Sequence, residues 1–194
     1  MRNAVSSGGE PPTPISVQTA NGRAEFERVD PKSAKLVLDY EVDTLRVQVP
    51  DASDEALQRA IEETCQQEIE RMRASLHGLG DALAEQLSDE GRDPAIDHTT
   101  NYKESRTWTD GRTQFLVDPS AYHSETQLDG YEDASDARLV RQTVAVTVQQ
   151  RELHIRELYR NMLADVSAAR AARRQAAPAE TAPPSFNNPP MSPA

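Results

Sequence analysis

The chain has 194 residues, a formal net charge of −11, 5% aromatic residues and a mean hydropathy of −0.71. This length fits one ordinary domain with tails. No apolar run approaches the roughly 18–20 residues of a membrane helix, and the N-terminus lacks the apolar stretch of a secretory signal. One cysteine excludes an intrachain disulfide, and the acidic charge argues against an overall basic nucleic-acid binder. We therefore expect no membrane partner and a cytoplasmic location, or a virion location if the protein is viral.

Charge varies strongly along the chain. Residues 51–137 carry 7 basic and 21 acidic side chains, whereas residues 138–175 carry 8 basic and 3 acidic ones. Such opposite charges favour pairing of the two segments, within one subunit or between neighbouring subunits. The basic residues are 18 Arg and 3 Lys. An arginine bias with an acidic excess is typical of salt-adapted proteins, so we expect a halophilic source, with an ordinary acidic protein of a GC-rich bacterium as the alternative.

A β-hairpin is predicted over residues 15–29. Two apolar-alternating segments there flank Asn21-Gly22, a dipeptide that favours type I′ turns because both central residues need a positive φ. A two-residue loop at this dipeptide would place Val17 opposite Phe26 and set the apolar side chains on one face of the hairpin. The sequence therefore predicts that the domain begins with an antiparallel strand pair.

Strands are also predicted over residues 35–49, where apolar and polar residues alternate. The alternation slips by one position near Asp43-Thr44, which indicates a bulge or a tight turn. Pro50 ends the segment, because proline cannot donate a backbone hydrogen bond to a sheet.

The strongest helix signal lies in residues 52–90. Apolar residues recur there every three or four positions: Leu57, Ile61, Cys65, Ile69, Met72, Leu76, Leu79, Leu83 and Leu87. This stripe predicts either a long amphipathic helix that packs on its own sheet or a coiled-coil-like seam that packs on a second subunit. Gly78 and Gly80 indicate a helix break or a close backbone approach. For the seam, the interface candidates are Ile69, Met72, Leu76, Leu79 and Leu83.

Residues 102–117 predict a second hairpin, which turns at an Asp-Gly pair and sets Trp108 across from Thr113. Trp108 is the only tryptophan, and it is a candidate anchor of the core or of an interface. The next segment, residues 118–137, is rich in acidic side chains and is predicted to be a loop.

Residues 139–149 favour a strand, because their valines and threonines are β-branched. A helical alternative remains open, since Val140, Val144 and Val148 also fit a period of about 3.6 residues. Residues 150–175 predict a basic helix. Its candidate contacts with an acidic partner or with nucleic acid are Arg156, Arg160, Arg170, Arg173 and Arg174.

Both termini are predicted to be flexible. Residues 1–13 are small, polar and rich in Pro and Gly, and residues 176–194 form a proline-rich tail. The tail carries an isolated aromatic residue, Phe186, so it is either a plain disordered tail or a docking peptide. Phe186 is therefore a further interface candidate.

Few residues point to chemistry. We find no nucleophile elbow, no phosphate-binding loop and no zinc-ligand spacing, so no cofactor and no metal are predicted. Cys65 lies on the apolar helix stripe, which favours a buried structural thiol over a nucleophile. One chemical alternative remains: Asp97 and His98 in one loop and Asp118 and His123 in another would converge into a site.

These elements together predict an α+β fold. Antiparallel β-hairpins form a sheet packed by one long amphipathic helix, with a C-terminal basic helix and flexible termini. Residues 14–175 form a single domain in this prediction. A core with so few aromatic residues is thin, so we expect oligomerisation to complete it.

The predicted function is that of a non-enzymatic structural or assembly protein. It would oligomerise with itself and with other assembly subunits through helix stripes and complementary charge. A virion component, such as a head–tail connector, a tail protein or a capsid-associated subunit, fits this architecture. One alternative is a cytosolic adaptor or regulator that uses its basic helix on nucleic acid or on an acidic partner. The other is an enzyme with the loop site of acidic residues and histidines.

Overall fold

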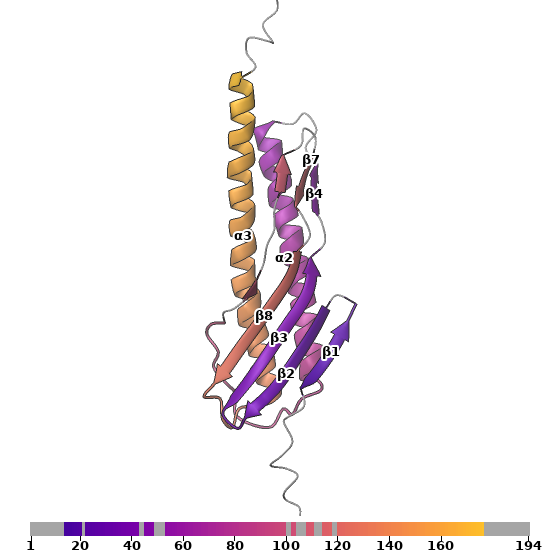
Figure 1. Cartoon of the computed structure of the whole chain (residues 1–194), viewed down its shortest axis with the longest axis vertical. Helices are drawn as coiled ribbons and strands as arrows, with labels where there is room; N and C mark the ends of the chain where they lie inside the picture. The colour runs from indigo at the N-terminus through magenta and orange to yellow at the C-terminus, as the bar shows by residue number, and fades with distance from the viewer. Residues whose placement is uncertain are drawn as a thin grey trace, which may run out of the picture.

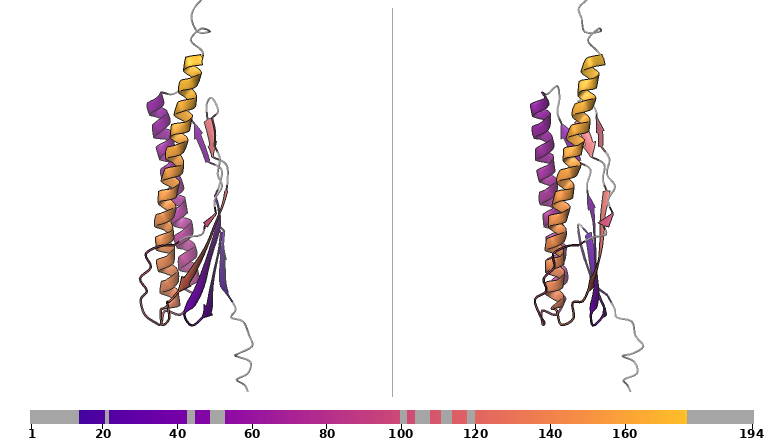
Figure 2. Two further views of the ribbon diagram at one scale, coloured as in Figure 1. Left: turned by 60° about the vertical axis from the view of Figure 1, so that its left-hand side comes forward. Right: turned by 90° about the vertical axis from the view of Figure 1, so that its left-hand side faces the viewer.

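The structure is a computed structural model in which two long helices lie against one face of an antiparallel sheet (Figures 1 and 2). It describes residues 14–20, 22–42, 45–48, 53–99, 102–103, 108–110, 114–117 and 120–176. The core fills the space between the sheet and the helix pair. The predicted α+β class, with a sheet of hairpins covered by a long amphipathic helix and a basic C-terminal helix, is confirmed.

The larger sheet has five strands in the order β1-β2-β3-β8-β5, and each neighbouring pair is antiparallel. Its strands are β1 (Ile15–Thr19), β2 (Gly22–Asp30), β3 (Ser33–Val42), β8 (Ser120–Asp129) and β5 (Tyr102–Lys103). The strands β1, β2 and β3 form a meander, and β8 joins them from the distant second half of the chain. The helix α2 therefore lies, in the sequence, between strands that pair with each other in the sheet.

The smaller sheet continues the larger one along the helices (Figure 1). It has the order β4-β7-β6, with β4 at Leu45–Gln48, β7 at Gln114–Val117 and β6 at Trp108–Asp110. The bulge or tight turn predicted near Asp43-Thr44 lies outside the described residues. On either side of it, Val42 faces Ser120 and Leu45 faces Val117, so the ladder of β3 with β8 and the ladder of β4 with β7 share one register.

The first hairpin forms as predicted, but its register differs by two residues. Val17 faces Ala24 instead of Phe26, and the pair Thr19 and Gly22 closes the hairpin. Gly22 is thus part of β2 and not of the turn. A Cβ at this position would overlap the carbonyl oxygen of Asp39 and lie 2.8 Å from the Cβ of Tyr40. Glycine is needed here because β3 approaches closely, and not because the turn needs a positive φ.

The second predicted hairpin is partly correct. β6 and β7 pair, but Trp108 faces Val117 instead of Thr113, and Tyr102–Lys103 pairs with β8 in the other sheet. The register of β7 follows from its other neighbour, β4, with which it extends the pairing of β3 and β8. The longer ladder thus overrides the local turn signal.

The helix α2 spans Asp54–Ala84, somewhat less than the predicted 52–90. Ser53 caps it, because its Oγ accepts a hydrogen bond from the backbone N–H of Ala56 at 3.2 Å. Asp54 and Glu55 follow in the first turn, where carboxylates complement the positive end of the helix dipole.

The prediction of a strand over residues 139–149 is wrong, because α3 is one continuous helix over Asp136–Ala176. Val140, Val144 and Val148 lie one helical turn apart and are buried. The hydroxyl groups of Thr143 and Thr147 donate to the backbone carbonyls four residues before them, at 2.6 and 2.8 Å. Packing of the valines against α2, with the threonines satisfied locally, overrides the β-propensity of the segment.

The prediction of an acidic loop over residues 118–137 is also wrong, because half of it forms β8. Tyr122, Ser124, Thr126 and Leu128 alternate as the buried face of this strand. Serine and threonine occupy two of these buried positions, so no apolar alternation marks the strand in the sequence. The described acidic residues of this segment alternate with the buried positions of β8, as Glu125 and Asp129 do, or follow the strand.

The two helices run antiparallel (Figure 2), and Gly80 of α2 lies close to the side chain of Val144 of α3. A Cβ at Gly80 would lie 2.9 Å from Cγ2 of Val144, whereas a Cβ at Gly78 would meet no atom within 4 Å. The close approach predicted from these glycines is therefore found at Gly80, and neither glycine breaks α2.

We expect the two glycines to respond in opposite ways to substitution by alanine. Gly78→Ala should raise the free energy of unfolding by about 1 kcal/mol, because alanine is the better helix former. Gly80→Ala should lower it, because Val144 is β-branched and buried and cannot move aside cheaply. Urea unfolding of both variants measures this, and equal effects of the two changes would contradict the close packing of α2 on α3.

Candidate interaction surfaces

The helix stripe that the sequence offered as an interface lies in the core of one subunit. Its side chains are at most 1% exposed: Ile69, Met72, Leu76, Leu79 and Leu83. They face α3 and the sheet, so the first of the two interpretations, packing within the subunit, is the one that the structure favours. A coiled-coil seam to a second subunit has no surface left to use on this face of α2.

The opposite charges of the two segments also pair within the subunit. Arg138 lies 3.3 Å from Asp89, Arg141 lies 3.6 Å from Asp81, and Arg73 of α2 contacts Glu152 of α3. At the far end, Arg170 and Arg174 reach Asp54 at 4.0 and 3.3 Å. Most of these pairs are exposed and stabilise the fold by well under 1 kcal/mol each. They favour the antiparallel orientation of the two helices more than they add to the stability of the fold.

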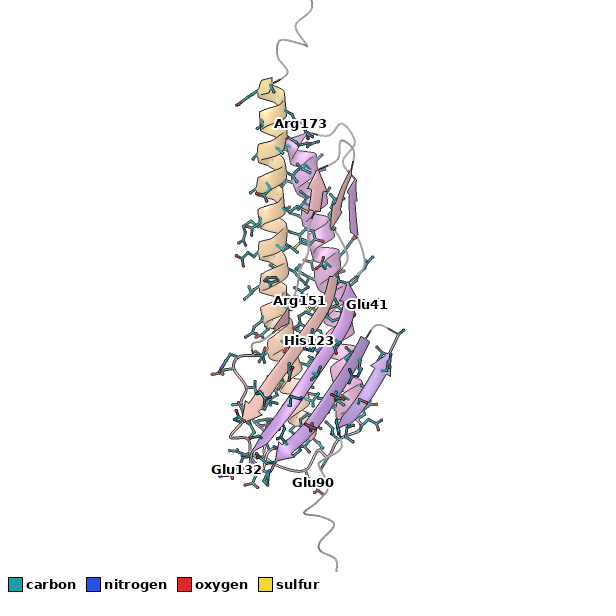
Figure 3. All side chains as sticks on the ribbon, viewed as in Figure 1. Glu41, Glu90, His123, Glu132, Arg151 and Arg173 are labelled. Carbon is teal, nitrogen blue, oxygen red and sulfur yellow. The ribbon has the colours of Figure 1, made fainter. Side chains whose placement is uncertain are left out.

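One ion pair is buried at the middle of the helix pair. Arg151 is 1% exposed, and its Nη2 lies 4.0 Å from Oε2 of Glu68 (Figure 3). The hydroxyl group of Tyr159 donates to Oε1 of Glu68 at 2.8 Å. The guanidinium of Arg151 also lies over the ring of Tyr122, 5.0 Å from its centre. This cluster joins α2, α3 and β8, so it is a structural centre and not a solvent-accessible site.

A groove of about 230 Å³ opens between α2 and α3. Apolar side chains, two of the candidate arginines and one glutamate line it: Ile61, Cys65, Tyr159, Leu163, Arg156, Arg160 and Glu62. Arg156 is held by Glu152, 3.3 Å away, one turn before it. Burial raises the pKa of the Cys65 thiol, so this cysteine is an inert part of the wall, as predicted.

The other candidate residues are not gathered at this groove. Arg170, Arg173 and Arg174 lie near the C-terminal end of α3, beside the start of α2 (Figure 3). The backbone of Trp108 lies in β6 of the smaller sheet, and its side chain is outside the described part of the structure. Phe186 also lies outside the described residues.

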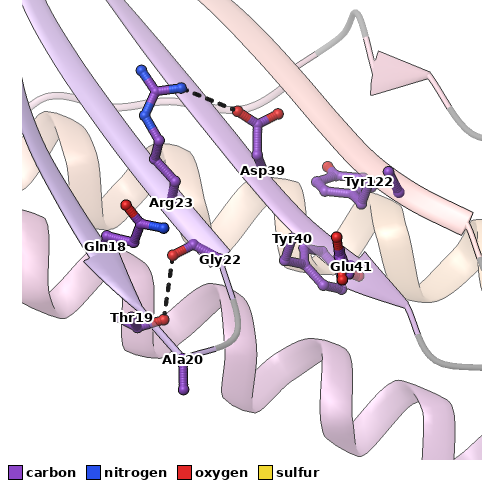
Figure 4. Close-up of a pocket in the computed structure, with 10 residues that line it drawn as sticks. Gln18, Thr19, Ala20, Gly22, Arg23, Asp39, Tyr40, Glu41 and Tyr122 are labelled. Carbon is purple, nitrogen blue, oxygen red and sulfur yellow. Dashed lines mark hydrogen bonds and ion pairs between the residues drawn. The ribbon is translucent and has the colours of Figure 1, made fainter.

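The outer face of the larger sheet carries polar and charged side chains that contact one another within and between strands. Nδ1 of His123 contacts Asp39, and its Nε2 lies 3.8 Å from Glu125. Arg23 lies 2.9 Å from Glu25 and 3.9 Å from Asp39. An open depression of about 570 Å³ lies beside these side chains, at the turn between β1 and β2 (Figure 4). Two carboxylates already neutralise its arginine, so the depression offers no concentrated charge to a ligand.

The loop site proposed for an enzyme is not assembled among the described residues. Asp97 and His98 bond to each other at 2.6 Å with both side chains largely exposed, and this hydrogen bond lowers the pKa of Asp97. His123 lies on the sheet with Asp39, and Asp118 is outside the described residues. Within the described ranges, no three His, Cys, Asp or Glu side chains are placed to hold a metal ion.

Comparison with models of protein families, with curated proteins and with solved structures finds no match for this chain. In the described part of the chain, neither helix has an apolar stretch long enough to span a bilayer. The surfaces themselves are therefore the only guide to function.

We expect the buried Arg151 and Glu68 to depend on each other. Arg151→Met or Glu68→Leu alone should lower the free energy of unfolding by about 3–5 kcal/mol, because each leaves a buried charge without its partner. The double variant should lose clearly less than the sum of the two. Arg156→Met, a matched change at an exposed position of the same helix, should cost under 1 kcal/mol. Additive losses in urea unfolding would show that the two side chains do not interact.

Proposed function

We propose that this protein is a non-enzymatic structural subunit that assembles with copies of itself and with other subunits. The observation that carries the proposal is the elongated shape of the molecule, with the first and last described residues at opposite ends. The described chain begins at Pro14 near one end and stops at Ala176 at the opposite end (Figure 1). The 41 residues of α3 span about 60 Å at 1.5 Å per residue. An elongated body of this kind has two well-separated end surfaces, which suits it to linking neighbours.

Rigidity along the whole rod supports the same role. Apolar side chains are buried from Leu57 at one end of the helix pair to Leu83 and Leu139 at the other. Ion pairs tie the helices near both ends, at Asp54 and at Asp81. A spacer that keeps two attachment points at a fixed distance needs such continuous packing.

The finer proposal is a part of a virion, such as a head–tail connector, a tail protein or a capsid-associated subunit, from a salt-adapted source. Its support is the combination of a compact sheet with long helices in an elongated body, together with the net charge of −11. Since the helix stripe and most helix charges are used within the subunit, we assign self-association to the remaining surfaces, which are the sheet edges, the outer sheet face and the helix groove.

Light scattering tests the proposal by measuring the mass in low salt and in about 2 M KCl. We expect a defined oligomer that grows or tightens in high salt, because salt screens the repulsion between acidic copies. A variant that ends at Ala176 shows whether the last residues contribute. A mass of 21.4 kDa for the full chain in every condition would contradict self-assembly.

The helix groove favours a second candidate function, that of an adaptor for an acidic partner. Arg156 and Arg160 flank its apolar wall beside Glu62, and the two guanidinium groups would attract an acidic peptide or a nucleic-acid strand. We expect polyglutamate or single-stranded DNA to bind with an affinity that falls steeply with salt. Arg156→Ala with Arg160→Ala should abolish this binding, while Arg59→Ala with Arg71→Ala, on exposed α2 positions, should leave it unchanged. Equal binding by both double variants in a filter assay would remove this candidate.

A further inference from the structure

The strand β1 is an open edge of the larger sheet and lacks the usual protection. Edge strands are commonly guarded by charged residues, by proline or by being very short, because an open edge pairs readily with another strand. Of the four strands at the edges of the described sheets, β4 contains Arg46, β5 contains Lys103 and β6 contains Asp110. β1 has five residues, Ile-Ser-Val-Gln-Thr, with no charge and no proline. This edge is therefore the one best suited to strand addition.

The register of the first hairpin shows which backbone groups the edge offers. The connection between Thr19 and Gly22 has two residues, so this closing pair exchanges its backbone hydrogen bonds. The bonded pairs alternate along an antiparallel ladder, so Val17 and Ile15 also bond to β2. The N–H and C=O groups of Ser16 and Gln18 then point away from β2, toward the open side. Both residues are exposed.

We propose that β1 pairs with β1 of a second copy of this chain, antiparallel and about a twofold axis at Val17. This inference rests on the proposed assembly function and names its contact surface. In this register Ser16 bonds to Gln18 of the second copy, and Gln18 bonds to its Ser16, so every outward backbone group of these residues is used. Val17 faces its own counterpart at the non-hydrogen-bonded position. The two larger sheets become one continuous sheet.

The side chains on both faces fit this pairing. On the inner face, Ile15 is 39% exposed and Val17 is partly buried against the core, so each copy extends the apolar layer of the other. On the outer face, Arg23 lies next to Gln18 and Glu25 lies next to Ser16. Across the axis, the row therefore runs from Arg23 through two neutral residues to Glu25 of the second copy. Opposite charges flank the contact, and no like charges face each other.

A cysteine at the axis tests the register directly. Val17→Cys should form a disulfide-linked dimer on mild oxidation, because the two Cα atoms would lie about 4.5 Å apart at a non-hydrogen-bonded pair. Ile15→Cys should not, because its counterpart lies about 13 Å along the strand. The native Cys65 is buried, so the unsubstituted chain should give no such dimer. If Ile15→Cys links as readily as Val17→Cys, the proposed pairing is wrong.

Lysines at the edge test whether this contact holds the assembly. Ser16→Lys with Gln18→Lys places like charges opposite each other and should at least halve the mass measured by light scattering. Gln149→Lys with Ala164→Lys adds the same charge on exposed positions of α3, away from β1, and should not change the mass. Circular dichroism verifies that both variants fold.

The outcomes separate this inference from the proposed function. If the wild type is an oligomer and Ser16→Lys with Gln18→Lys does not change its mass, the β1 pairing is wrong. The proposed assembly function is then not contradicted. A wild type that is a monomer at every salt concentration, together with no disulfide dimer of Val17→Cys, would overturn both. A folded edge variant that loses half of its mass, while the α3 variant keeps it, supports the pairing.

Discussion

The antiparallel packing of α2 on α3 is the constraint on which the rest of this structure depends. It buries a stripe from each helix, brings the backbones together at Gly80 and Val144, and encloses Arg151 with Glu68. The sheet is then laid on one face of this pair, with Tyr122 of β8 against the guanidinium of Arg151. Loss of the helix pair would leave the sheet without a core, because its other face is polar.

This packing decides which surfaces remain for partners. The longest apolar stripe is buried inside one subunit, and most of the complementary charges are paired there. Neither is therefore available for contacts between subunits. Three surfaces remain. They are a polar outer sheet face with charge pairs such as Arg23 with Asp39, a small groove beside Arg156, and an uncharged sheet edge at β1. Association through backbone hydrogen bonds suits such a molecule, because strand pairing needs no large apolar patch.

The sequence predicted those features that depend on local pattern. The stripe from Leu57 to Leu83 identified α2, and alternation identified β1 to β3, because in these elements the buried positions are apolar. The hydrophobic pattern did not predict elements whose buried residues are polar or whose residues favour another secondary structure. β8 buries Ser124 and Thr126, which carry no apolar signal, and the first turns of α3 are built from valines and threonines that favour strands in isolation.

The candidate surfaces were predictable to a smaller extent. Charge counts predicted that an acidic and a basic segment pair, but not that the partner is in the same chain, because that choice depends on the antiparallel order of the helices. The open edge at β1 could not be predicted either. A strand becomes an edge through the strand order of the sheet, which is set by the distant pairing of β3 with β8.

Hydrogen exchange at several protein concentrations tests whether the packing of α2 on α3 is complete within one subunit. Backbone amides of α2 and α3 should then exchange slowly even in dilute solution. The amides of Ser16 and Gln18 should exchange fast in dilute solution and become protected as the concentration rises. If the α2 and α3 amides are protected only in concentrated solution, the helix stripe depends on a second subunit, and the account is contradicted.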